Sequence, residues 1–375
     1  MPASFALEVP HRVQIYSTTR GKLYHMNGHT APRSAGVAIR HNLADMAQAC
    51  SRRYYATYHR SAAPSPEYRA KSERDVAYHL GYLCDSLWAE DQELFAGYVC
   101  WAAELFASMG FSPSMLPDLL DAMQSELNQR LSPAQVEAVN GYFVAAHGAL
   151  AQRVATPSYL DENNPHHELA SVYLEALLDG RRHDATQIIL DAVRAGARVD
   201  EIYLNVFQQT QAEIGRLWQM NRITVAQEHY VTAATQFAMA QLYPYIFSTR
   251  RRGARLVAAS VGDELHELGI RMVADFFEMA GWDTYYIGAS TPTRDLVAAV
   301  TAHRPNVVAL SATLTTHLMR VSEVIDALHK IPDRPAILVG GYPFNVSPEL
   351  WRRLGADGTA TDARSAVQLA ESSLA

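Results

Sequence analysis

The sequence predicts two all-α regions followed by an α/β domain built on a doubly wound, five-stranded parallel sheet. Apolar residues recur at helical spacing from about residue 34 to residue 246. Short β-rich runs then alternate with amphipathic runs to the end of the chain. Polar, turn-rich segments separate these regions, so we expect domains at 1–155, 156–250 and 251–375.

Composition limits the class of protein. The 375 residues are 49% hydrophobic and 19% charged, as in ordinary folded proteins. A formal charge of −7 argues against direct nucleic-acid binding, and no apolar run reaches the ~18 residues of a membrane helix. Cys50, Cys84 and Cys100 form no CxxC pair, and no secretory segment is evident. We therefore expect reduced thiols and a cytoplasmic location.

The first region is predicted to be helical beyond an irregular stretch at 1–34. Its aromatic residues gather in two stretches, 54–59 and 78–88, the second of which contains His79. Aromatics at helical spacing usually form a core. The same side chains also suit a pocket for a flat, apolar ligand, with nearby arginines available for anionic groups.

The second region has four helical segments joined by short connections, which predicts a four-helix bundle. The segments are 168–178, 184–195, 200–219 and 225–246. In the third region the expected strands are 256–261, 284–287, 307–311, 336–339 and a weak one at 358–360. The expected helices are 268–280, 293–302, 317–329, 347–353 and 363–373.

The loop after the first strand carries the most informative residues. Glu264 precedes His266 by two positions, and Gly269 follows at the start of a helix. A carboxylate at this spacing can hold one ring nitrogen and direct the other at a metal, and the glycine permits close backbone approach. A lone loop histidine is more often a simple polar residue, so the neighbouring strands decide between the two interpretations.

Those strands end in small or polar residues. Ser311 ends the third strand and Thr313 follows it, and Gly340 and Gly341 close the fourth. In doubly wound sheets, ligands bind at the carboxyl ends of the strands, where strand order reverses. Small side chains leave a slot there for a flat or extended group. The sequence has no GxGxxG turn at this place, which disfavours a dinucleotide site.

This set of residues resembles the cobalamin-binding family, whose sheet is flavodoxin-like. The resemblance implies that His266 is the lower axial ligand of cobalt and replaces the cofactor's own base. It also implies that the displaced tail lies beside Ser311 and Thr313, towards Gly340 and Gly341. The family commonly has aspartate where this chain has Glu264.

The bundle carries a second spacing, Trp218 followed by Glu228 and His229. A core tryptophan at a helix end is the simpler interpretation. Placed before a cobalamin domain, W-x9-EH resembles the light-sensing cobalamin photoreceptors, including the carotenoid-operon repressors. That resemblance implies that the three residues line the adenosyl group of adenosylcobalamin, which visible light removes. In those repressors the residue after the tryptophan is a histidine that captures cobalt after photolysis, whereas this chain has Gln219. Either another histidine captures cobalt, with His229 the nearest candidate, or the light state is not a bis-histidine adduct.

The repressors begin with a DNA-binding domain, which this sequence lacks. A helical, globin-like first region before a W-x9-EH bundle and a cobalamin domain resembles the photocobilins. This implies biliverdin as a second chromophore, with His79 as a candidate bilin contact. Non-covalent binding is the default expectation, although Cys84 or Cys100 offers a thioether.

We therefore expect a photoreceptor rather than an enzyme. Light would alter a homo-oligomer or the binding of a downstream partner. Two alternatives remain: a corrinoid methyl carrier of a methyltransferase system, and a light-independent cobalamin sensor. A mutase is disfavoured because nothing resembles a substrate-binding barrel.

Overall fold

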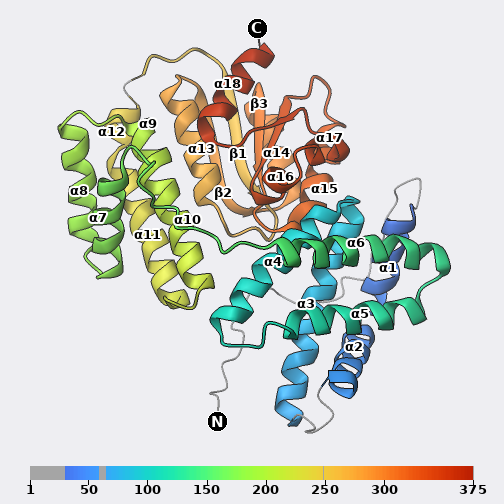
Figure 1. Ribbon diagram of the computed structural model, residues 1–375. Helices are drawn as coiled ribbons and strands as arrows, with labels where there is room; N and C mark the ends of the chain where they lie inside the picture. Colours follow the sequence, from blue (N-terminus) through green and yellow to red (C-terminus); the bar gives the residue numbers. More distant parts are fainter. Residues whose placement is uncertain (1–29, 59–64, 248, 375) are drawn as a thin grey trace. The chain divides into compact units, whose positions relative to one another are not determined.

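The computed structural model describes residues 30–58, 65–247 and 249–374. They form two compact units, one within Met1–Val154 and one within Ala155–Ala375 (Figure 1). Almost all of the region predicted to be irregular, 1–34, lies outside the described residues. No helix in the described ranges is long and apolar enough to cross a membrane. The predicted fold class is confirmed: a helical N-terminal part precedes a five-stranded parallel sheet.

The first unit is all-α. Its helices are α1 (Ala31–His41), α2 (Leu43–Tyr58), α3 (Pro66–Ala89), α4 (Gln92–Ser108), α5 (Met115–Arg130) and α6 (Pro133–Gln152). Proline begins α3 and α6, where its missing N–H costs no hydrogen bond. The Oγ of Ser65 caps α3 by accepting from the Tyr68 amide at 3.2 Å. Apolar faces of all six helices meet in one core.

The second unit begins with the helical bundle. It comprises α7 (His167–Leu178), α8 (Arg182–Arg194), α9 (Val199–Ile202), the π-helical turn η1 (Tyr203–Phe207), α10 (Gln208–Gln219), α11 (Val225–Gln241) and α12 (Tyr243–Ile246). The helix predicted at 200–219 is therefore continuous but contains a π turn. The helix predicted at 225–246 breaks before Tyr243, because Pro244 has no N–H with which to continue it.

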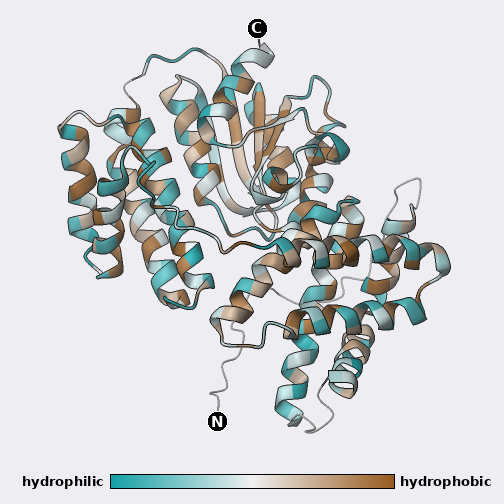
Figure 2. Cartoon of the chain, in the orientation of Figure 1, coloured by the Kyte–Doolittle hydropathy of each residue, from teal (hydrophilic) through white to brown (hydrophobic). Residues whose placement is uncertain are grey.

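The sheet follows in the order β2-β1-β3-β4-β5, all parallel. Its strands are β1 (Arg255–Val261), β2 (Asp283–Thr291), β3 (Val307–Ser311), β4 (Ala336–Gly340) and β5 (Gly358–Thr359). The central strands are mostly hydrophobic (Figure 2), as expected where helices cover both faces. Strand order reverses between β1 and β3, which places the switch point at their carboxyl ends.

Helices cover both faces of the sheet. One face carries α13 (Leu268–Met279) and α18 (Ala363–Leu374), and the other carries α14 (Thr293–His303) and α15 (Leu318–Leu328), which follows the 3-10 turn η2 (Thr315–His317). The helix predicted at 347–353 is displaced. The structure has α16 (Tyr342–Val346) and α17 (Leu350–Leu354), because Ser347 and Pro348 interrupt the helical backbone between them.

The bundle packs on α13 through a buried polar contact. The Tyr203 hydroxyl in the π turn donates to Asp275 Oδ2 at 2.9 Å, and the rings of Tyr203 and Phe276 meet edge to face. Just before Tyr203, Asp200 and Glu201 of α9 pair with Arg364 of α18. Bundle and sheet therefore share one continuous core.

Asp275 makes this junction sensitive to pH. Burial raises its pKa to about 6, although Tyr203 and Arg271 favour the charged form. The unfolded chain therefore loses this proton first as pH rises, so folding stability falls between about pH 4 and 6. We expect Asp275→Asn to stabilise the protein by about 1–3 kcal/mol at pH 8 and to have little effect at pH 4. Urea unfolding at both pH values measures this, and an equal effect at both would contradict it.

Candidate functional site

The carboxyl ends of three adjacent strands form the floor of the site. Ser260 of β1 is in register with Ser311 of β3, and Ser311 with Gly340 of β4. Gly341 has φ +109°, and a Cβ there would lie 2.0 Å from the Ala312 carbonyl oxygen, so only glycine fits. The strand ends at Ser260, Ser311 and Gly340 therefore form a row without bulky side chains, in agreement with the sequence pattern.

The loop between β1 and α13 turns sharply at Asp263, which has φ +69°. The Glu264 amide donates to the Val261 carbonyl at 3.0 Å, and the Ser290 amide donates to the Glu264 carbonyl at 2.8 Å. These contacts direct the Glu264 side chain inward, where it is completely buried.

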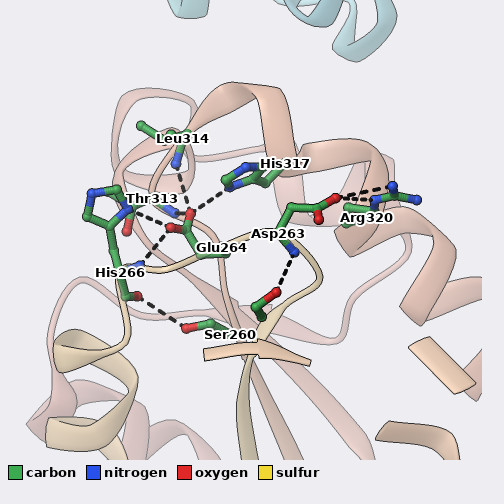
Figure 3. A network of polar contacts seen from close by, with 9 residues as sticks. Ser260, Asp263, Glu264, His266, Thr313, Leu314, His317 and Arg320 are labelled. Atoms are coloured by element: carbon green, nitrogen blue, oxygen red, sulfur yellow. Dashed lines mark hydrogen bonds and ion pairs between the residues drawn. The ribbon is translucent and has the colours of Figure 1, made fainter. Parts of the chain in front are cut away.

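The Glu264 carboxylate accepts five hydrogen bonds (Figure 3). His266 supplies its ring Nδ1 at 2.5 Å and its amide at 2.9 Å, both to Oε1. The amides of Thr313 and Leu314 reach Oε2 at 2.6 and 3.2 Å, and His317 Nδ1 reaches it at 2.9 Å. Burial alone would raise the pKa of Glu264, but these donors, His266 and His317 above all, hold it well below its usual range.

His266 is thereby oriented for a ligand. Its Nδ1 faces Glu264, so its Nε2 points away from the carboxylate (Figure 3), and its side chain is 58% exposed. Burial would lower the pKa of His266, but the hydrogen bond and charge of Glu264, with a contribution from Glu228, raise it. One fixed nitrogen and one exposed nitrogen fit an axial metal ligand, and the small residues of the strand ends fit the adjoining part of a large cofactor.

Glu267 is a second carboxylate beside His266, and sequence reasoning missed it. Its Oε2 accepts from the Tyr286 hydroxyl at 2.9 Å and the Ala289 amide at 3.0 Å. Its Oε1 accepts from Gln236 Nε2 of α11 at 2.9 Å. The residue therefore ties the His266 loop to β2 and to the bundle. His317 was also missed, although its place in the loop after Ser311 offered a signal.

Other predicted residues contribute less directly to this network. Thr313 acts through its backbone amide. Nothing among the described atoms lies within 4 Å of a Cβ placed on Gly269, so this glycine leaves open space at the start of α13. Gln219, the departure from the repressor pattern, is buried in α10.

The bundle residues Trp218, Glu228 and His229 lie at the end of α10 and the start of α11. Trp218 is half-buried, whereas His229 is 68% exposed and places Nδ1 2.5 Å from Glu228 Oε2. Glu228, at the start of α11, contributes to the raised pKa of His266. The structure thus brings Glu228 and His266 into electrostatic range from two distant segments.

His79 lies in the first unit. It is buried among aromatic rings, with Nδ1 2.8 Å from the Tyr98 hydroxyl, and Tyr98 stacks on Tyr82 at 3.8 Å. Its Nε2 has no hydrogen-bond partner among the described residues, and burial lowers its pKa to about 4. The aromatic surroundings fit the prediction of a flat ligand, which stays a prediction. Cys84 is buried and Cys100 is partly buried.

In comparisons with known proteins, the second unit is similar to B12-binding domains and corrinoid proteins. Residues 254–368 and residues 169–243 each match a B12 binding domain model. A corrinoid protein of Desulfitobacterium hafniense is 24% identical over 204 residues, covering 52% of this chain and 93% of that relative. Dimethylamine corrinoid protein 1 of Methanosarcina mazei is 24% identical over 211 residues, covering 54% and 95%. The monomethylamine corrinoid protein of Methanosarcina barkeri shares the fold, with a TM-score of 0.50, 20% identity and coverage of 56% and 99%.

We expect Glu264→Gln to destabilise the protein by about 2–4 kcal/mol at pH 7, because an amide cannot satisfy five donors. The pKa of Glu264 is lowered on folding, so the difference from wild type is fully present above pH ~5 and shrinks as pH falls. The variant should also retain cobalamin less well during gel filtration, because the His266 ring loses its orienting acceptor.

Asp263→Asn is the matched control for this experiment. Asp263 is an adjacent carboxylate that pairs with Arg320 at 3.2 Å, but its side chain is 53% exposed. Its loss should change stability by less than about 1 kcal/mol. Equal losses in the two variants would show that burial of Glu264 has no special importance.

Proposed function

We propose that this cobalamin-binding protein is a corrinoid carrier that holds its cofactor through His266 and acts on, or for, a partner protein. The observation that carries the proposal is the fixed Nδ1 and exposed Nε2 of His266, at the edge where small strand-end residues leave room for a displaced cofactor tail. When bound, cobalamin supplies a cobalt centre that takes an alkyl group on its upper face.

The corrinoid proteins to which the second unit is similar support methyl transfer as the carrier's task. In this proposal His266 and Glu264 hold the lower face, and a methyltransferase in trans supplies or removes the methyl group. Leu265 is 56% exposed beside the 58% exposed His266 side chain, so the loop offers apolar surface to the cofactor or to a partner. The chain itself needs no catalytic acid or base for this role.

A second candidate function, light sensing, is favoured by a different observation. Trp218 lies in the last turn of α10, and Glu228 at the start of α11 contributes to the raised pKa of His266. These residues would line the adenosyl group of adenosylcobalamin, and its loss in light would change the packing of the two helices. The output would be a change in a homo-oligomer or in the binding of a downstream partner. A light-independent cobalamin sensor would use the same site without photolysis.

One experiment separates these functions. The full chain is loaded in the dark with methylcobalamin or adenosylcobalamin and analysed by size exclusion before and after illumination. A methyl carrier should bind methylcobalamin at least as tightly as the adenosyl form, transfer its methyl group to a thiolate in the dark, and keep its size in light. A light sensor should prefer adenosylcobalamin and change size on illumination. His266→Ala should weaken binding of both cofactors, and unchanged retention would overturn the proposed site.

For light sensing we expect Trp218→Ala to leave His266 coordination intact but to abolish the difference in size between dark and illuminated samples. The matched control is Trp351→Ala, a partly buried tryptophan stacked under Arg352 in α17. A Trp218 variant that still changes size in light would exclude this tryptophan as the sensing element.

Biliverdin, if it is a second chromophore, would bind the first unit near His79. The Nε2 of His79, which has no hydrogen-bond partner in the part of the chain that the structure describes, and the stacked rings of Tyr82 and Tyr98 support this placement. We expect the full chain incubated with biliverdin to show a red absorption band after gel filtration, and His79→Ala to lose it. Absence of a red band from wild type would remove the bilin from the proposal.

A further inference from the structure

A line of polar side chains crosses the bundle between α7, α10 and α11; we refer to Tyr173, Gln211, Thr232 and Thr235 as the polar seam. The Thr232 hydroxyl donates to Gln211 Oε1 at 3.0 Å, and Gln211 Nε2 donates to Thr235 Oγ1 at 3.0 Å. Tyr173 donates to the same Thr235 oxygen at 3.1 Å. Thr235 and Tyr173 are fully buried. Partnered polar groups in an apolar core favour one relative placement of the helices that carry them.

The polar seam continues towards the residues at the end of the bundle. Gln211 precedes Trp218 by seven residues, so the two share a face of α10. Thr232 follows Glu228 by four residues on α11, and its hydroxyl also lies 3.3 Å from Glu228 Oε1. Because α10 and α11 are joined by a short connection, they run antiparallel, and their shared ends carry Trp218 and Glu228.

The same face of α11 reaches the His266 loop. Gln236, one turn beyond Thr232, donates to Glu267 Oε1 at 2.9 Å. Glu267 directly follows His266 and is held by Tyr286 and Ala289. One hydrogen bond, from Gln236, therefore joins α11 to the His266 loop. The hydrogen bonds of Gln211 join α10 to α11.

We infer that Gln211 is a positioning residue that determines which upper axial group of cobalamin the protein accepts. It touches no cofactor; it sets the separation of Trp218 from Glu228, and so the space above the face opposite His266. The inference rests on the proposed placement of cobalamin over His266, and it adds a specificity determinant that either proposed function would use.

The test compares dissociation constants for adenosylcobalamin, methylcobalamin and hydroxocobalamin, measured in the dark on the full chain. We expect Gln211→Leu to move the ratio of the dissociation constants for adenosylcobalamin and methylcobalamin towards one by roughly three- to tenfold. A change of this size corresponds to the loss of one or two hydrogen bonds. The absorption spectrum that reports histidine coordination should stay as in wild type. Thr232→Val should act like Gln211→Leu, and Thr232→Ser, which keeps the hydroxyl, should restore the wild-type ratio.

Thr210→Val is the matched control. Thr210 is the fully buried neighbour of Gln211 in α10, and its hydroxyl has no hydrogen-bond partner among the described residues. This variant should leave all three constants unchanged. If Gln211→Leu weakens all three cobalamins by one factor, or leaves the ratio unchanged, the residue has only a structural role and the inference is overturned. If wild type lacks the spectrum of histidine coordination, the proposed site fails instead.

Discussion

The second unit depends on one buried carboxylate. Glu264 has no exposed surface, and a buried charge is tolerated only where donors surround it. Those donors come from the β1 loop, the β3 loop and η2, so the carboxylate draws three segments together at the switch point of the sheet. The orientation of His266 and the path of the loop after Ser311 both follow from satisfying this charge.

A second carboxylate extends the arrangement to the bundle. Glu264 fixes the His266 ring, and Glu267 fixes the loop on which that ring stands, taking one of its three donors from α11. His266 is therefore held by the sheet loops, and its own loop is also bonded to the bundle through Gln236. The hydrogen bonds of Gln211, Thr232, Gln236 and Glu267 form a chain of contacts from α10 through α11 to the His266 loop.

The two proposed functions differ only in what they require on the face of the bound cobalamin opposite His266. Methyl transfer requires that a partner reach this face, whereas light sensing requires that the chain's own residues pack against the group bound there. The polar seam bears on both proposals, because its hydrogen bonds join α10 to α11, the helices that carry Trp218 and Glu228. In the first unit, the buried His79 has a ring nitrogen without a hydrogen-bond partner among residues 30–58, 65–247 and 249–374, and methyl transfer by the second unit offers no role for it.

The sequence by itself determined the three-part order of helices, bundle and sheet, because hydrophobic periodicity and turn residues are local signals. It also identified the Glu264–His266 loop and the small strand ends, since in a parallel sheet carboxyl ends must share an edge. Only the tertiary structure decided that His317 completes the shell of Glu264, that Glu267 joins the loop to Gln236, and that a π turn carries Tyr203 to Asp275. These contacts join residues 31 to 72 positions apart, and no local pattern encodes which distant side chain will meet a buried charge.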